Sequence, residues 1–70
     1  MPVVKVIELL AQSNKGWEDA TQMAVREAAQ SIQNIKSVYV KDFQAIVEDN
    51  RIVEYRVNLK VSFVVDKSMR

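Results

Sequence analysis

The spacing of apolar residues divides the chain into a strand, a helix and two further strands. The first residues, VVKVIELL, are rich in β-branched side chains and too short for a convincing helix, which predicts a strand over about residues 3–11. From Trp17 to Ile35 the apolar residues recur every three or four positions, the period of one helix face. This spacing predicts an amphipathic helix over about residues 15–35.

The predicted helix carries small residues on its apolar side. Ala20, Ala24 and Ala28 form a stripe that would let the helix approach a sheet closely. Polar side chains line the opposite side. Ser13 or Asn14 is expected to cap the start of the helix, because short polar side chains accept hydrogen bonds from the first free N–H groups.

The second half of the chain is predicted to form two strands joined by a tight turn. Apolar residues alternate over about residues 37–48 but change phase near Lys41 and Asp42, which predicts a β-bulge or a bend. The polar cluster EDNR then predicts a hairpin turn. Strict alternation follows and predicts a last strand over about residues 51–66.

The lengths of these elements do not match. As a strand, Ile52 to Val65 would extend about 46 Å at roughly 3.3 Å per residue. The helix from Trp17 to Ile35 would cover only about 29 Å at 1.5 Å per residue. Part of the apolar sheet face is therefore expected to stay bare in a single chain, and we expect copies of the chain to cover it for one another.

Length, composition and charge narrow the function classes. The chain has 70 residues with hydrophobic 49% and charged 27%, which indicates one domain over residues 1–70. Cys 0 and His 0 exclude a cysteine nucleophile, a Ser-His-Asp triad and a zinc site of thiolate or imidazole ligands. A net charge of +1 with interspersed signs disfavours nucleic acid as a partner.

The sequence also bears on location. It has no apolar stretch of the roughly 18 residues that a membrane span needs. Its first residues lack the charged-then-apolar layout of a signal peptide. We therefore expect no membrane partner and a cytoplasmic location.

Three segments resemble the dodecins, small flavin-associated proteins that form hollow dodecamers. They are KVIEL at residues 5–9, SNKGWEDA at residues 13–20 and EYRVNLKVSFVV at residues 54–65, and the resemblance runs from Lys5 to about Asp66. It implies an α+β subunit of order β-α-β-β, in which a three-stranded antiparallel sheet wraps around one helix. It also implies a homododecamer with ligand pockets where subunits meet.

The resemblance points to four candidate cofactor-binding residues. Ser37 stands where flavin-binding dodecins have a Trp that stacks on the isoalloxazine ring, and Arg56 stands where a Gln reaches the polar edge of the flavin. Gln44 replaces the Arg of an Arg-Gly pair, whereas Asp42 matches an acid seen near the site in some members. The implied cofactor is a flavin, riboflavin or FMN. Arg56 could instead stack on a ring or hold a phosphate or carboxylate.

These residues favour binding over catalysis. The leading hypothesis is a homododecameric storage or sequestration protein that binds a small molecule, with flavin as the family's ligand. The alternative is a structural or regulatory hollow assembly that has lost flavin binding, as Ser37 suggests. An enzyme subunit using Asp42 and Arg56 is the third option, but it has no recognisable nucleophile or motif.

Other residues have simpler structural interpretations. Trp17 begins the apolar side of the helix, which favours packing, and Tyr55 alternates with apolar neighbours, which favours a core or interface position. Tyr39 is out of phase with its neighbours and is a candidate to replace the missing indole. Asp49 and Asn50 are better explained by a solvated turn than by a calcium loop.

Overall fold

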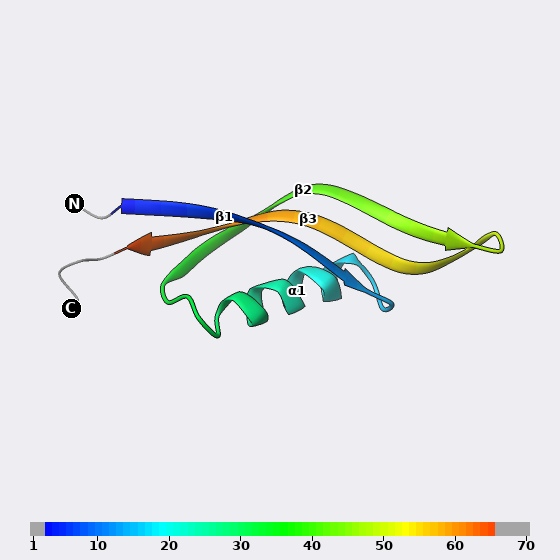
Figure 1. Cartoon of the computed structure of the whole chain (residues 1–70), viewed down its shortest axis with the longest axis horizontal. Coiled ribbons are helices and arrows are strands. Elements are labelled where there is room, and N and C mark those ends of the chain that lie inside the picture. The colour runs from blue at the N-terminus through cyan, green and yellow to red at the C-terminus, as the bar shows by residue number, and fades with distance from the viewer. Residues whose placement is uncertain (1–2, 66–70) are drawn as a thin grey trace.

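A computed structural model describes residues 3–65 as one helix packed on a three-stranded antiparallel sheet (Figure 1). The elements are β1 (Val3–Ser13), α1 (Trp17–Ala28), β2 (Ile35–Glu48) and β3 (Arg51–Val65). β3 lies between β1 and β2 in the sheet. The expected α+β fold of order β-α-β-β is confirmed.

The strand bounds differ from the sequence pattern at two positions. β1 extends to Ser13, beyond the expected end at residue 11. β2 begins at Ile35, before the expected start at residue 37. The expected last residue of the final strand, Asp66, lies outside the described residues.

The helix is shorter than its apolar period predicts. α1 ends at Ala28, so the expected helix over residues 15–35 is wrong at its C-terminal end. The Ile32 N–H still donates to the Ala28 carbonyl at 2.9 Å, but Asn34 adopts a left-handed φ of 64°. The Asn34 carbonyl already accepts a hydrogen bond from the Val64 N–H at 3.1 Å, so sheet pairing overrides helical propensity here. The described residues include no helix with the length and apolar character to cross a membrane.

The start of α1 has no side-chain cap. Gly16 holds the N-cap position with φ 155°, where residues with a Cβ are strained, and the expected cap by Ser13 or Asn14 is wrong. The Ser13 hydroxyl instead accepts a hydrogen bond from the Lys15 N–H at 3.0 Å and donates to the Asp19 carboxylate at 2.5 Å. Ser13 thus ties the end of β1 to the first turn of α1.

The turn of the β2–β3 hairpin and one of its three register shifts are where the sequence predicts them; the shifts at Ile35/Ser37 and Ile46/Val47 were not predicted. Asp49 and Asn50 form the turn with left-handed φ values of 53° and 62°, as in tight two-residue hairpins. The pairing register shifts between Val40 and Asp42, which leaves Lys41 as the extra residue of a β-bulge.

The core lies between one side of α1 and one face of β3. Ala20 and Ala24 of α1 pack in one buried cluster with Val57, Leu59 and Val61 of β3. The small alanine side chains let the helix backbone come close to the sheet, as the sequence predicts.

The helix leaves much of the sheet uncovered. α1 has 12 residues and spans about 18 Å at 1.5 Å per residue, whereas β3 has 15 residues and spans about 50 Å at 3.3 Å per residue. The hairpin projects well past the helix (Figure 1). Phe43, Val47 and Ile52 in this hairpin are 64%, 57% and 51% exposed. The mismatch of lengths is therefore larger than the sequence predicts.

Candidate functional site

The two faces of β3 carry different kinds of side chain. Val57, Leu59 and Val61 face the helix and are fully buried. Arg56 and Asn58 lie between them in sequence, and their side chains point to the opposite face because successive strand residues alternate. We call this opposite side the open face of the sheet, made of Arg56, Asn58 and the residues paired with them on β1 and β2.

The strand register brings two rows of mostly polar residues together on the open face. The first row consists of Gln12, Arg56 and Gln44 and the second of Leu10, Asn58 and Asp42, each in the order β1, β3, β2. Directly paired residues of antiparallel strands have Cβ atoms about 4.5 to 5.5 Å apart, so side chains within a row can touch. The rows are adjacent because their β3 members are two positions apart.

All members of these two rows except Gln12 line a pocket of about 360 Å³. Its lining residues come from all three strands and are Leu10, Asp42, Phe43, Gln44, Arg56 and Asn58. Asp42, Gln44 and Arg56, three of the four candidates named from the sequence, therefore meet in one pocket. Ser37 does not line it.

The Arg56 side chain is held in place from β1. Its Nε donates a hydrogen bond to Gln12 Oε1 at 3.1 Å. Within residues 3–65, one ion pair is present, between Lys41 and Glu8 at 3.5 Å. Arg56 and Asp42 do not form one. The pocket thus contains two opposite charges that do not neutralise each other by direct contact.

Asn58 contributes a polar atom without a partner. Its Oδ1 is buried and accepts no hydrogen bond from any residue that the structure describes. A buried acceptor without a hydrogen bond lowers the free energy of unfolding by about 1 to 3 kcal/mol. Asn58 is paired directly with Asp42, so the two residues lie at the same end of the pocket.

Ser37 lies elsewhere on the open face. Its Oγ is 2.5 Å from Ser62 Oγ, the side chain of its paired residue on β3. Tyr39 is paired with Lys60 on the same face and is 66% exposed. An aromatic side chain therefore lies near Ser37 along β2, although it does not line the pocket.

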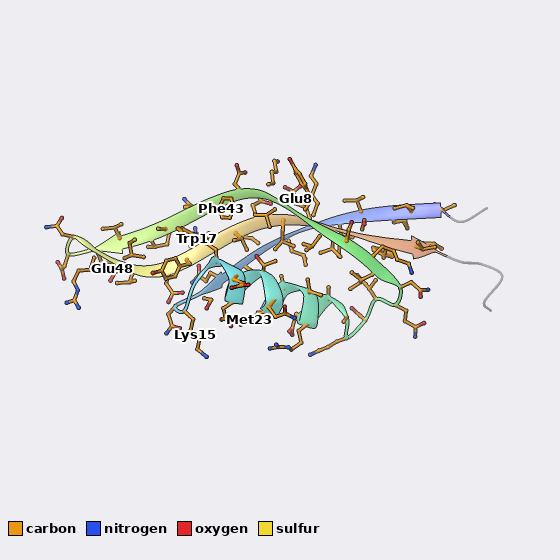
Figure 2. All side chains as sticks on the ribbon, turned by 180° about the vertical axis from the view of Figure 1, so that it is seen from behind. Glu8, Lys15, Trp17, Met23, Phe43 and Glu48 are labelled. Carbon is orange, nitrogen blue, oxygen red and sulfur yellow. The ribbon has the colours of Figure 1, made fainter. Side chains whose placement is uncertain are left out.

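An aromatic cluster joins the start of α1 to the hairpin (Figure 2). The ring of Trp17 lies edge-on to those of Tyr55 and Phe43, with centroids 5.0 and 5.8 Å apart. The indole N–H donates to the backbone carbonyl of Gln44 at 3.1 Å. Trp17 therefore packs, as the sequence predicts, and holds the part of β2 from which Gln44 reaches the pocket.

A second, more apolar groove lies between β1 and α1. It has a volume of about 430 Å³, and its lining includes Ile7, Leu9, Met23, Ala28 and Ile32. Sequence patterns did not indicate this groove, because its two sides come from elements whose packing the patterns do not specify.

Sequence reasoning also missed part of the pocket. Leu10, Phe43 and Asn58 were not among the candidates, although they line it. The signal for Asn58 was its position two residues after Arg56 in a strictly alternating strand, which places both side chains on one face. No comparable signal existed for Leu10, since its place depends on the register between β1 and β3.

Comparison with known proteins identifies the relatives of this chain. The family model described as Dodecin matches residues 3–66. A calcium dodecin of Mycobacterium tuberculosis is 35% identical over 63 residues, which cover 90% of this chain and 89% of that protein. A dodecin of Thermus thermophilus is 29% identical over 66 residues, which cover 94% of this chain and 96% of that protein.

Solved structures agree with the sequence comparison. A crystal structure of a Thermus thermophilus dodecin mutant superposes with a TM-score of 0.90 at 28% identity, covering 96% of this chain and 100% of that one. The crystal structure of the Mycobacterium tuberculosis calcium dodecin, described as having a novel calcium-binding site, has a TM-score of 0.80 at 33% identity. It covers 94% of this chain and 94% of that one.

Proposed function

The chain belongs to the dodecin family, and on that premise we propose that it forms a homododecamer which stores or sequesters a small molecule at its subunit junctions. The observation that carries this proposal is the pocket on the open face, where Asp42, Gln44 and Arg56 meet. The pocket offers binding groups, so the proposed role is binding rather than catalysis, with the cytoplasm as the proposed location.

Exposed apolar side chains support the proposed assembly. On the projecting hairpin, Phe43, Val47 and Ile52 are more than half exposed, and so are Val4 and Val6 on β1. Covering such surface stabilises an assembly by about 25 cal/mol for each Å² removed from water. Within residues 3–65, β1 and β2 are the outer strands of the sheet, and their outer edges invite association of further copies. A closed point-group assembly covers these surfaces without leaving open ends.

The family's ligand makes a flavin, riboflavin or FMN, the first molecule to test. The Mycobacterium tuberculosis relative is named for calcium instead. For this chain we favour an organic molecule, because the guanidinium of Arg56 lines the same pocket as Asp42 and repels a divalent cation placed beside that carboxylate.

One observation favours the alternative, a structural or regulatory hollow assembly without flavin binding. Ser37, at the position of the family's stacking Trp, is engaged with Ser62 and offers no ring. Stacked aromatic pairs gain about 0.5 to 1.5 kcal/mol beyond the area they bury, and Ser37 supplies none of this. Flavin affinity is therefore the property that separates the two functions.

Light scattering on the purified full-length chain tests the assembly. We expect a mass of about 96 kDa, that of twelve chains of 8.0 kDa each. A folded monomer at low micromolar concentration would contradict the proposal. Titration of riboflavin and FMN, followed by quenching of flavin fluorescence, then distinguishes storage of a flavin from the ligand-free alternative.

A substitution at Ser37 sharpens the flavin test. Ser37→Trp restores a flat ring on the open face and should raise riboflavin affinity by about tenfold. Gln30→Trp is the control, because Gln30 is exposed in the turn after α1, outside the sheet, and should leave the affinity unchanged. Equal riboflavin affinity in both variants and the wild type argues against flavin at this site.

A further inference from the structure

The pocket on the open face has a cationic end. The guanidinium of Arg56 is oriented by the hydrogen bond from its Nε to Gln12 Oε1 at 3.1 Å. This contact uses one of its five donors and leaves the planar fork for a ligand. Such a fork suits a carboxylate, which accepts two parallel hydrogen bonds.

The other end of the pocket is anionic. Asp42 supplies an exposed carboxylate there, directly paired with Asn58. An exposed carboxylate calls for a cationic group with hydrogen-bond donors. An ammonium group has three N–H donors and a positive charge that suits the carboxylate.

The two ends are close but not joined. Arg56 and Asn58 are two positions apart on β3, which separates their backbones by about 7 Å. Asp42 is paired with Asn58, and in the described residues it forms no ion pair with Arg56. A ligand with only a positive charge would be repelled by Arg56, and one with only a negative charge would be repelled by Asp42. A ligand that carries both charges satisfies both ends.

An apolar side chain completes the pocket. Leu10 is paired with Asn58 on the open face, lines the pocket and is 64% exposed, so it has apolar surface to offer a ligand. Removing such surface from water favours a ligand that has an apolar body in addition to its charged groups.

We propose that this pocket binds a small zwitterion of the amino-acid type with an apolar side chain. Arg56 holds its carboxylate, Asp42 holds its ammonium group, and Leu10 contacts its apolar body. This inference rests on the proposed small-molecule function and names the class of molecule that the pocket selects.

Three probes that share one apolar body test the proposal. L-Phenylalanine carries both charges, 3-phenylpropionate carries only the carboxylate and 2-phenylethylamine only the ammonium group. Calorimetry with the assembled full-length protein should show L-phenylalanine binding about tenfold more tightly than either single-charge probe, since each charged hydrogen-bonded contact is lost in one of them. Trp17, the only tryptophan, contacts Phe43 and gives a second readout by fluorescence.

Two variants assign each charge to its residue. Asp42→Asn should reduce the preference for L-phenylalanine over 3-phenylpropionate to about twofold while keeping the preference over 2-phenylethylamine. Arg56→Gln should have the reverse effect. Glu54→Gln and Lys60→Gln are the matched controls, because both residues share the open face of β3 with Arg56 but do not line the pocket, and they should change neither preference.

Similar affinity for all three probes in the wild-type protein overturns the proposal, whatever the variants do. So does a preference that survives both Asp42→Asn and Arg56→Gln. If the assembly forms and binds riboflavin but not L-phenylalanine, this inference fails while the proposed function stands. If the chain neither assembles nor binds any of these molecules, the proposed function fails as well.

Discussion

The two faces of β3 differ although they alternate along a single strand. Toward α1, Val57, Leu59 and Val61 are fully buried against small alanine side chains. On the open face, Arg56 and Asn58 line a pocket that no helix covers.

This difference separates stability from binding within one strand. The helix face removes apolar area from water, which stabilises the fold. On the open face Asp42 has no ion pair, and the Oδ1 of Asn58 has no hydrogen-bond donor among residues 3–65, an arrangement that costs stability in a single chain. A substitution on one face should therefore change mainly the free energy of unfolding, and on the other mainly the affinity for a ligand.

The largest effect on stability should come from removing a buried side chain from the helix face of β3. Leu59→Ala should lower the free energy of unfolding by about 2 to 5 kcal/mol, because the cavity cannot collapse completely. Urea denaturation at a fixed chain concentration measures the change. Lys60→Ala, at the neighbouring exposed position, should change it by less than about 0.5 kcal/mol. Equal effects of the two substitutions would contradict the division between faces.

Overfilling the same face should have the next largest effect. Ala24 is 6% exposed and packs against β3, so Ala24→Leu should cost about 1 to 3 kcal/mol through displaced neighbours. Ala29→Leu places the same side chain at the exposed residue just after α1 and serves as the control. A Tm that falls equally in both variants would show that the alanine stripe does not determine the close approach.

A smaller effect should come from losing the hydrogen bond between Trp17, at the start of α1, and the backbone of Gln44 on β2. Trp17→Phe keeps an aromatic ring but loses the indole hydrogen bond to the Gln44 carbonyl, which should cost about 1 kcal/mol. Tyr55→Phe is the control, since it keeps the ring that contacts Trp17. Thermal unfolding measures both. No difference between the two variants would mean that the indole N–H does not help to position β2.

The smallest effect should come from the ion pair near the pocket. Lys41 and Glu8 lie 3.5 Å apart, and their side chains are 47% and 48% exposed. Glu8→Gln should therefore cost no more than about 1 kcal/mol. The difference from the wild type should shrink in about 1 M salt, where the Debye length is about 3 Å. A larger, salt-independent loss of stability would show that this pair is buried in the assembly.

Local rules explain which structural predictions succeeded. The bulge at Lys41 followed from a change of phase, and the turn at Asp49 and Asn50 followed from residue types that tolerate a left-handed conformation. Both depend only on neighbouring residues. The end of α1 was misplaced because Ile35 keeps the helical spacing but pairs with Phe63 in the sheet, a partner far away in sequence.

The candidate site was predictable only in part. Resemblance to a family supplied Asp42, Gln44 and Arg56, and the structure brings these three together. It also supplied Ser37, which the structure places with Ser62 outside the pocket. The unpartnered oxygen of Asn58 could not be inferred from sequence, since whether an atom has a partner depends on every surrounding strand.

The sequence by itself determined the order of the elements, the alternation of β3 and the excess of apolar strand over helix, because each follows from local periodicity and the fixed rise per residue. Only the tertiary structure decided which residues of β1 and β2 lie beside Arg56 and Asn58. That choice depends on register, and a shift by one residue would turn every paired side chain to the other face. The pocket and its unpaired charges therefore exist only in the folded sheet.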